Sequence, residues 1–325
     1  MKETKRDQLI DILANSQNGF ISGQELSRNL QISRTAVWKH INELKKDGYQ
    51  FEAVPKRGYR LLSRPSAVNE STIKWDLQTE WLGQSLVFKD EVDSTQNIAH
   101  QLAREGAVNG TTIIANKQLH GRGRLNREWV SHHDDGIWMS MILRPEMAPC
   151  HASQMTLFTA TSVVDTLAKF ANIPVKIKWP NDLFINDKKF CGILTEMQAE
   201  LDHIEYMVIG IGINVNQESM SFPEEIRQKS TSLAIETQEK WDRRVLIQQL
   251  LVDFETTYRE FLTQGFSYVK DKWTNNAYKL GEKVLVNMPK KSFEATIEGI
   301  TDDGALLVRT IDNNIEKIYS AEIHW

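Results

Sequence analysis

The chain has 325 residues, of which 41% are hydrophobic and 25% are charged, values typical of a globular protein with two or three domains. No apolar run approaches the roughly 18 residues of a membrane span, and residues 1–7 are too polar to begin a signal peptide. Cys150 and Cys191 are the only cysteines, too few for a disulfide framework, which favours a reducing, cytoplasmic location.

The net charge of −4 conceals an uneven distribution. Residues 1–65 carry 12 Lys and Arg against 7 Asp and Glu, whereas the rest of the chain carries 27 against 36. A small basic module joined to an acidic body is typical of a nucleic-acid reader attached to a second function. Chance variation over a mixed surface would give the same imbalance, so local sequence has to decide.

The basic module has the spacing of a helix-turn-helix. Residues 5–14 place apolar side chains at helical intervals. Ser22 and Glu25 form a predicted capping box for a short helix. A three-residue linker then leads into a second helix over residues 34–47, with Ser33 at its N-cap. This pattern predicts a DNA-binding fold, and a three-helix packing module without a ligand is the alternative.

A basic hairpin follows the second helix. Residues 49–54 and 59–62 are predicted strands, and the turn between them contains Lys56 and Arg57. This hairpin would be the wing of a winged helix, in which first-turn side chains of the second helix reach base edges and cations bind phosphates. The candidate DNA-binding residues are Arg34, Thr35, Trp38, Lys39, Lys56 and Arg57.

The chain beyond the break at Arg64-Pro65-Ser66 alternates strand-like and helix-like runs. Predicted strands cover 86–88, 111–115, 137–143, 175–179, 183–185, 191–197 and 206–215. Predicted helices cover 95–104, 155–170 and 243–262. The strands crowd together with few helices between them, which indicates an α+β layer with a mixed sheet.

The last fifty residues have a different pattern. Four short predicted strands, at 283–287, 293–301, 305–310 and 315–319, are separated by turn residues and indicate a small all-β barrel. We therefore expect three domains, at 1–65, 66–275 and 276–325, with the chemistry confined to the middle one.

The strongest local motif is Gly-Arg-Gly-Arg at 121–124. Its glycines let the backbone approach a ligand closely, and its arginines suit a carboxylate or a phosphate. The Gly-Lys-Ser/Thr ending of a P-loop is missing. A flexible basic surface loop is the alternative.

Three further motifs contain polar groups at strand or helix ends. Lys-Trp-Pro-Asn-Asp at 178–182 forms a predicted turn between strands, and Lys189 is either an exposed edge charge or a cation placed in a site. Gly210 and Gly212 alternate within a predicted strand. Glycines weaken a strand interior, so their presence there indicates that another group approaches the backbone closely. Asp-Ser-Thr-Gln-Asn at 93–97 is either a helix cap or a ligand-binding terminus.

Other chemistries are not indicated. No Cys/His spacing matches a zinc site, so His132 and His133 are expected to be solvated. No G-x-S-x-G elbow indicates a serine hydrolase.

The order of these motifs is more specific than any one of them. A winged helix is followed by D-S-T-Q-N, Q-x-x-G-R-G-R, K-W-P-N-D, K-x-x-G-I-L, G-I-G-I-N and a small barrel. This order resembles the biotin–protein ligases, specifically the bifunctional class that also represses biotin-synthesis genes. The resemblance implies an α+β protein with a winged helix-turn-helix, a central mixed-sheet catalytic domain of the biotin/lipoate ligase type, and a C-terminal SH3-like β-barrel. Leu125-Asn126 departs from the basic-Gly continuation of some members.

The resemblance also implies a reaction in two steps. Biotin and Mg-ATP give biotinyl-5′-adenylate and pyrophosphate, and the acyl group then passes to a lysine of a biotin carboxyl-carrier domain. The implied ligands are biotin, ATP and Mg²⁺. The implied partners are the carrier domain, operator DNA and, on ligand binding, a second copy of the chain, with no membrane involved.

Site residues follow from the resemblance, position by position. The implied catalytic cations are Arg122, Arg124 and Lys189. The implied biotin-binding residues are Ser94, Thr95, Gln96, Gln118, Arg122, Gly123, Arg124 and Lys189. The implied nucleotide-binding residues are Gly121, Trp129, Lys178, Asn181, Gly210, Gly212 and Asn214. Asp182 is the candidate Mg²⁺ ligand.

Two alternatives to this function remain at the level of sequence. One is a ligand-sensing repressor whose catalytic domain is inactive, although the full set of basic residues argues against it. The other is a ligase for a different acid such as lipoate, although such enzymes lack this N-terminal module.

Overall fold

The computed structural model describes residues 5–14, 16, 19–63, 65–170, 173–289 and 291–324. Two features used above lie outside them: residues 1–4 at the start of the chain and Arg64 of the predicted linker. The chain divides into two compact units, residues 1–77 and 78–325. Among the described residues, no helix combines the length and apolar character needed to cross a membrane.

The first unit is the predicted winged helix, with one more short helix at its end. Its elements are α1 (Lys5–Ala14), α2 (Gly23–Leu30), α3 (Arg34–Lys46), β1 (Gln50–Val54), β2 (Gly58–Ser63) and α4 (Glu70–Lys74). Ser22 and Ser33 are confirmed as N-caps, because their hydroxyls accept bonds from the backbone N–H groups of Glu25 and Ala36. The predicted capping box is only half formed in the described part of the chain, since Glu25 does not bond back to Ser22. One face of α3 is buried through Val37, Ile41 and Leu44.

The hairpin β1–β2 is antiparallel, and the segment before α2 pairs with the outer edge of β2. Ile21 and Tyr59 exchange backbone hydrogen bonds of 2.9 Å in both directions. Gly58 allows this contact, since its φ is +109° and a Cβ there would lie 2.0 Å from the Ile21 carbonyl oxygen. The wing is thereby attached to the helix-turn-helix.

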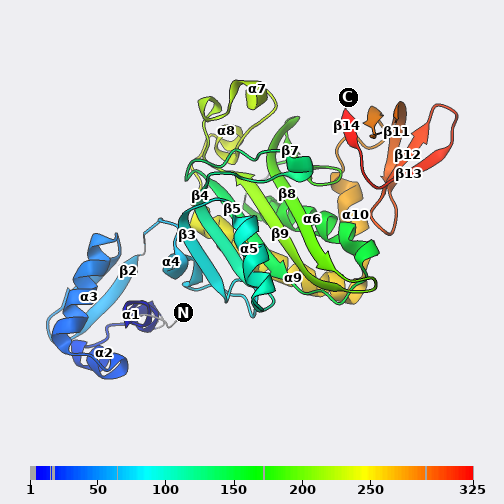
Figure 1. The fold of residues 1–325 in the computed structure, drawn as a ribbon. Helices are drawn as coiled ribbons and strands as arrows, with labels where there is room; N and C mark the ends of the chain where they lie inside the picture. The colour runs from blue at the N-terminus through cyan, green and yellow to red at the C-terminus, as the bar shows by residue number, and fades with distance from the viewer. Residues whose placement is uncertain are drawn as a thin grey trace. The chain divides into compact units, whose positions relative to one another are not determined.

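The second unit is built on a seven-stranded sheet (Figure 1). Its strands are β3 (Leu86–Val92), β4 (Thr112–Gln118), β5 (Gly136–Leu143), β6 (Lys176–Lys178), β7 (Asp182–Ile185), β8 (Lys188–Ala199) and β9 (Ile204–Asn214). Their order is β3-β4-β5-β9-β8-β7-β6. Only β3 and β4 pair in parallel, so the mixed sheet expected from the crowded strands is confirmed.

Helices cover both faces of this sheet (Figure 1). Helix α5 (Thr95–Arg104) packs on β4, β5 and β9, and α6 (Ala152–Phe170) and α9 (Arg243–Gln264) pack together on the opposite face. The sequence predicted these three and missed α10 (Phe266–Asn276) and the short α7 (Glu224–Arg227) and α8 (Leu233–Thr237). Helix α10 buries Phe266, Val269 and Trp273.

The C-terminal region is a five-stranded antiparallel sheet. Its strands are β10 (Lys283–Asn287), β11 (Ser292–Ile300), β12 (Leu306–Thr310), β13 (Ile315–Ile318) and β14 (Glu322–His324), in the order β13-β12-β11-β10-β14. The first four match the predicted strands, and β14 was not predicted. The Trp179 indole N–H donates to the Gly304 carbonyl oxygen at 3.0 Å, which joins this sheet to the turn at 178–182. Both cysteines are free thiols.

Candidate functional site

One pocket in the second unit brings together most of the predicted ligand-binding residues. It has a volume of about 210 Å³ and lies between residues 122–129, strands β8 and β9, the start of α5 and strand β14. The predicted residues that line it are Ser94, Thr95, Gln96, Gln118, Arg122, Gly123, Arg124, Trp129, Lys178, Asn181, Asp182, Lys189, Gly210 and Gly212. Gly121 and Asn214 are buried and do not line it; the Asn214 amide donates to the Thr231 carbonyl oxygen instead.

The floor of the pocket is a chain of buried polar side chains. The Gln118 side-chain oxygen accepts bonds from the Thr95 backbone N–H at 2.9 Å and the Thr95 hydroxyl at 3.1 Å. Thr95 lies 2.9 Å from the Ser140 hydroxyl, which in turn donates to the Gln96 side-chain oxygen at 3.0 Å. These bonds fix the orientation of each group before any ligand arrives.

Ser94 differs from these neighbours. Its hydroxyl is at the N-cap of α5 but makes no capping bond. It is buried and has no hydrogen-bond partner among the described residues. A buried hydroxyl without a partner costs about 1–3 kcal/mol, so its place in the pocket wall favours the ligand-binding interpretation of 93–97 over the helix-cap one.

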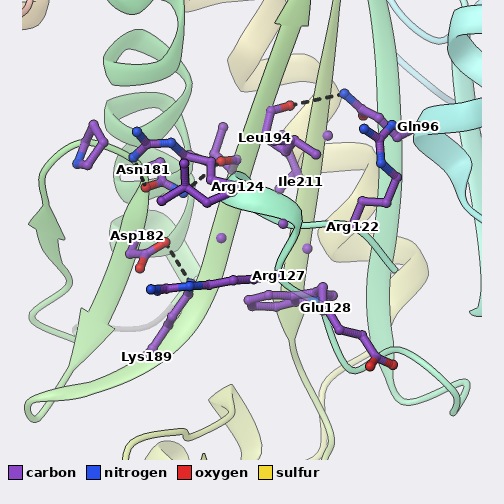
Figure 2. A pocket seen from close by; sticks show the side chains of 18 of the residues that line it. Gln96, Arg122, Arg124, Arg127, Glu128, Asn181, Asp182, Lys189, Leu194 and Ile211 are labelled. Carbon is purple, nitrogen blue, oxygen red and sulfur yellow. Dashed lines mark hydrogen bonds and ion pairs between the residues drawn. The ribbon is translucent and has the colours of Figure 1, made fainter. Parts of the chain in front are cut away.

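Cations occupy the side of the pocket near β6–β8 (Figure 2). The Lys189 ammonium lies 2.8 Å from Asp182 Oδ1 and 5.2 Å from the centre of a Trp129 ring. Arg124 donates to the Asn181 side-chain oxygen at 3.0 Å. Burial lowers the pKa values of Arg124 and Lys178. Lys189 is half-buried and ion-paired in the pocket, so it is a placed cation and not an exposed edge charge.

The strand glycines make room for two side chains of the protein itself. A Cβ on Gly212 would lie 2.6 Å from Trp129 Nε1, and one on Gly192 would lie 2.9 Å from the same indole. A Cβ on Gly210 would lie 2.6 Å from the Gln96 side-chain oxygen. The predicted close approach to these glycines is confirmed, and the approaching groups are Trp129 and Gln96.

Arg122 lies apart from the other cations, beside Gln96 in Figure 2. Its guanidinium donates two bonds to Glu196, of 2.7 and 3.1 Å, and one of 3.1 Å to Asn97. Hydrogen bonding from His100 is the main reason that the pKa of Glu196 falls to about 2, with Gln96 and Arg122 adding to it. The Glu196 carboxylate is therefore ionised throughout the neutral range.

The loop backbone has positive φ angles at Leu125 and Asn126, where the sequence departs from the family pattern. Leu125 and Asn126 have φ values of +55° and +57°, a region that costs a branched residue such as leucine about 1–2 kcal/mol. The Leu125 side chain is exposed. Internal hydrogen bonds from Gly123 to the Arg127 carbonyl oxygen and from Trp129 to the Gly121 carbonyl oxygen close the loop on itself.

The C-terminal sheet contributes to the pocket, which the sequence did not predict. Residues 321–324, in and beside β14, line it, and Glu322 pairs with Arg127 of the loop. The expectation that the site lies wholly within the middle domain is therefore wrong for the pocket wall. Arg127 is three residues beyond Arg124, so the sequence could have indicated it as a further loop cation. Strand β14 has only three residues, so its sequence offered almost no indication that it lines the pocket.

Few side chains in the pocket could act as the predicted protein ligands of Mg²⁺. No group of three or more His, Cys, Asp or Glu side chains is placed to hold a metal ion among the described residues. Asp182 is already paired with Lys189. His132 and His133 are exposed, as predicted.

The first unit offers a separate candidate interface. A groove between the start of α3 and the wing is lined by Arg34, Thr35, Trp38 and Lys56. These four, Lys39 and Arg57 are all exposed. Trp38 is 58% exposed, a high value for a large aromatic side chain, and Arg57 lies over the Phe20 ring at 4.2 Å.

Comparison with known proteins places this geometry in a family. Residues 5–60 match the HTH domain family, 88–214 the Biotin/lipoate A/B protein ligase family, and 279–324 the Biotin protein ligase C terminal domain family. The chain is 46% identical over 323 residues to the bifunctional ligase/repressor BirA of Bacillus subtilis (strain 168), covering 99% of each chain. The chain belongs to the bifunctional biotin–protein ligase/repressor family.

Other family members agree with this assignment. The bifunctional ligase/repressor BirA of Escherichia coli (strain K12) is 30% identical over 301 residues, covering 92% of this chain and 91% of the relative. The biotin protein ligase of Aquifex aeolicus, solved in complex with biotin and ATP, superposes with a TM-score of 0.64 at 31% identity. That likeness covers 74% of this chain and 97% of the other. The α+β fold and the combination of a ligase with a repressor are thus family properties of this protein.

Proposed function

We propose that the pocket binds biotin and ATP side by side and joins them as biotinyl-5′-adenylate. The observation that carries this is the meeting of two surfaces: a fixed polar floor that contains the unpartnered Ser94 hydroxyl, and a cationic side formed by Arg124 and Lys189. The first suits a ureido group, which both donates and accepts hydrogen bonds. The second suits a carboxylate and phosphates.

Each part of biotin has a counterpart in the wall. Ser94, Thr95 and Gln118 would hydrogen-bond the ureido end, and Gln96 borders them through Ser140. The lining also includes the apolar side chains of Met139, Ile193, Leu194 and Ile211, which suit the thioether ring and the alkyl chain. Arg124 and Lys189 would then receive the carboxylate.

The chemistry of the first step follows from charge. A biotin carboxylate oxygen attacks the α-phosphorus of ATP, a new oxygen–phosphorus bond forms, and the bond to the β-phosphate bridge breaks to release pyrophosphate. Negative groups approach one another in this step, so Arg124 and Lys189 would lower the barrier by neutralising the developing charge. Lys189 would exchange Asp182 for the ligand.

The nucleotide would lie against Trp129, Lys178, Asn181 and the backbone of Gly210 and Gly212. Gly121 and Asn214 would act from behind this wall, by holding the Trp129 backbone and the segment at Thr231. Mg²⁺ would arrive on the ATP phosphates, since it is usually held by substrate oxygens and one or two carboxylates. Asp182 is the only predicted protein ligand.

In the second step the amine of a lysine on a biotin carboxyl-carrier domain attacks the acyl carbon. An amide bond forms, AMP leaves and the amine loses a proton. No group of the enzyme has to bond covalently to biotin.

The remaining roles follow the family. The exposed residues Arg34, Thr35, Trp38, Lys39, Lys56 and Arg57 would contact operator DNA, with ligand binding favouring a DNA-competent homodimer. We place this activity in the cytoplasm. We also divide the chain into functional domains at 1–65, 66–275 and 276–325, each of which contains one of the family matches.

Incubation with ATP, Mg²⁺, biotin and a biotin-acceptor domain tests the proposal. We expect pyrophosphate release and a biotinylated acceptor. Biotin binding without pyrophosphate release would instead support an inactive sensor. Calorimetry with biotin and lipoate identifies the acid, and tighter binding of lipoate would overturn the choice of biotin.

A further inference from the structure

The ion pair between Arg122 and Glu196 joins the pocket loop to the sheet. Both guanidinium Nη atoms donate to the carboxylate, at 3.1 and 2.7 Å. The pair is half-buried, with side-chain exposures of 37% and 29%. A planar two-point contact of this kind fixes orientation as well as distance.

Further contacts hold both partners of the pair. Arg122 also donates to Asn97 on α5, and Asn97 donates to Asp93 at 2.8 Å. On the other side, His100 Nε2 lies 3.2 Å from Glu196 Oε2. Arg122 is therefore held between a helix and a strand that belong to the rigid frame of the catalytic region.

Arg124 has a different environment, although only one residue separates it from Arg122. Its guanidinium donates to the neutral amide oxygen of Asn181, and no carboxylate of the described residues forms an ion pair with it. Arg124 can bind an anion without breaking an ion pair. Arg122 would first have to give up two bonds to a carboxylate whose pKa is about 2.

We infer that Glu196 is a positioning residue, which holds Arg122 as the anchor of the loop so that Arg124 is presented to the bound anion. Arg122 then stabilises the loop and is not itself the ligand's counter-charge. This refines the sequence-based expectation that Arg122 and Arg124 act alike. The catalytic part of the inference depends on the proposed ligase function, whereas the part concerning loop order does not.

The loop backbone reports the anchor directly. The amide N–H groups of Gly123 and Trp129 donate to carbonyl oxygens inside the loop, at 2.7 and 2.8 Å. Their hydrogen exchange therefore measures how often the loop opens. The variants to compare in the full-length, ligand-free protein are E196Q, R122Q, R122K and the double variant E196Q/R122Q.

We expect E196Q and R122Q each to speed exchange across residues 121–129 by about fivefold to tenfold, the range for a partly buried, hydrogen-bonded ion pair. The double variant should be no faster than either single one, because both remove the same contact. R122K keeps the charge but loses the two-point geometry, so it should resemble R122Q. E298Q removes a comparable ion pair with Arg309 in the C-terminal sheet and should leave the loop unchanged.

Steady-state kinetics of pyrophosphate release provide the second measurement. With the loop less ordered, the KM for biotin should rise about fivefold in E196Q and R122Q, while kcat changes less than about twofold.

Two results would overturn the inference. Loop exchange in E196Q equal to that of the wild type would show that no anchor exists. A fall in kcat of about a hundredfold in R122Q but not in E196Q, with R122K near the wild type, would show that Arg122 acts on the ligand itself. If the wild type releases no pyrophosphate, the proposed ligase function fails, and hydrogen exchange alone still decides whether Glu196 anchors the loop.

Discussion

The winged helix and the ligand pocket both present cations, but the two sets differ in their surroundings. The side chains of the first unit that we propose contact DNA are exposed, with Lys39 74% exposed and 3.9 Å from Glu43. Among the pocket cations, Lys189 and Arg122 are 31% and 37% exposed and each contacts a carboxylate. Arg127 also contacts a carboxylate but is 66% exposed. Exposed cations suit a polyanion whose counterions can be released, whereas partly buried cations that protein partners hold in one orientation suit a single small anion placed in one geometry.

This difference predicts that binding in the two regions responds to different conditions. Binding through the winged helix should depend strongly on salt, because its charges act through water. Binding in the pocket should depend on exchange of partners at Lys189, which has to leave Asp182, whereas Arg124 is held by a neutral amide and breaks no ion pair. Substitutions in the winged helix should therefore change DNA binding and leave ligation intact, and substitutions in the pocket should change ligand binding and adenylate formation.

The largest effect is expected for Lys189→Ala. Removing a cation that faces the attacking carboxylate should slow adenylate formation by about a hundredfold or more. Asp182 is only 21% exposed and loses its ion-pair partner in this variant. The charges of Arg124 and Lys178 still act on it, so the fold should be retained, which thermal unfolding checks. Pyrophosphate release measures the rate, and Lys188→Ala, which changes the exposed neighbour, is the control. A wild-type rate in Lys189→Ala would remove this residue from the mechanism.

The second-largest effect is expected on DNA binding. Replacing Lys56 and Arg57 by alanine should weaken operator binding by more than about tenfold and reduce the slope of log K against log salt by up to about 2. Ligation should stay at the wild-type level. Lys317→Ala, an exposed lysine of the C-terminal sheet, should change neither property. An unchanged salt slope in the double variant would show that the wing does not contact phosphate.

Ser94→Ala tests the polar floor with a smaller effect. Biotin affinity measured by calorimetry should fall about tenfold, since a hydrogen bond to the ligand is lost. The ligand-free protein should be as stable as before or slightly more stable, because an unpartnered buried hydroxyl is removed. Ser140→Ala should instead destabilise it by about 1 kcal/mol or more in thermal unfolding, because Ser140 bonds Gln96. Equal destabilisation by both variants would contradict the role of Ser94.

The smallest effect is the pH dependence of the loop anchor. The pKa of Glu196 is lowered from 4.5 to about 2, so its contribution to stability is complete above pH 4.5 and is lost as the pH falls toward 2. Its exposure to water keeps that contribution below about 1 kcal/mol. The difference in unfolding free energy between wild type and E196Q should therefore vanish over this range. A difference that stays constant down to pH 2 would show that the carboxylate charge is not what matters.

Local signals predicted the winged helix almost completely. Ser22 and Ser33 cap the helices in which they were predicted. Gly48, just after α3, has a φ of +93°, a conformation that glycine adopts readily at the end of a helix. Each of these features depends on residues a few positions apart, so neighbouring sequence was enough. Helix α4, at the end of this unit, has only five residues, too few for a periodic pattern.

The pocket was only partly predictable. The motif order identified the residues of α5, the loop and β8, but not which of them would pair. Glu196 and Arg122 are 74 positions apart and Glu322 and Arg127 are 195 apart, and no local pattern links such distant residues. Gly121 and Asn214 have the expected motif positions, yet lie behind the wall.

By itself, the sequence determined the order of elements, the family and the residue types that face a small anionic ligand, because capping, periodicity and motif spacing are short-range properties. Only the tertiary structure decided how the charges are used. Strand register put Lys189 beside Asp182, and the packing of α5 against β9 put His100 close to Glu196. Whether a cation is available to a ligand depends on whether a carboxylate of the protein already contacts it. That contact forms between residues far apart in the sequence, so it is determined by the tertiary structure.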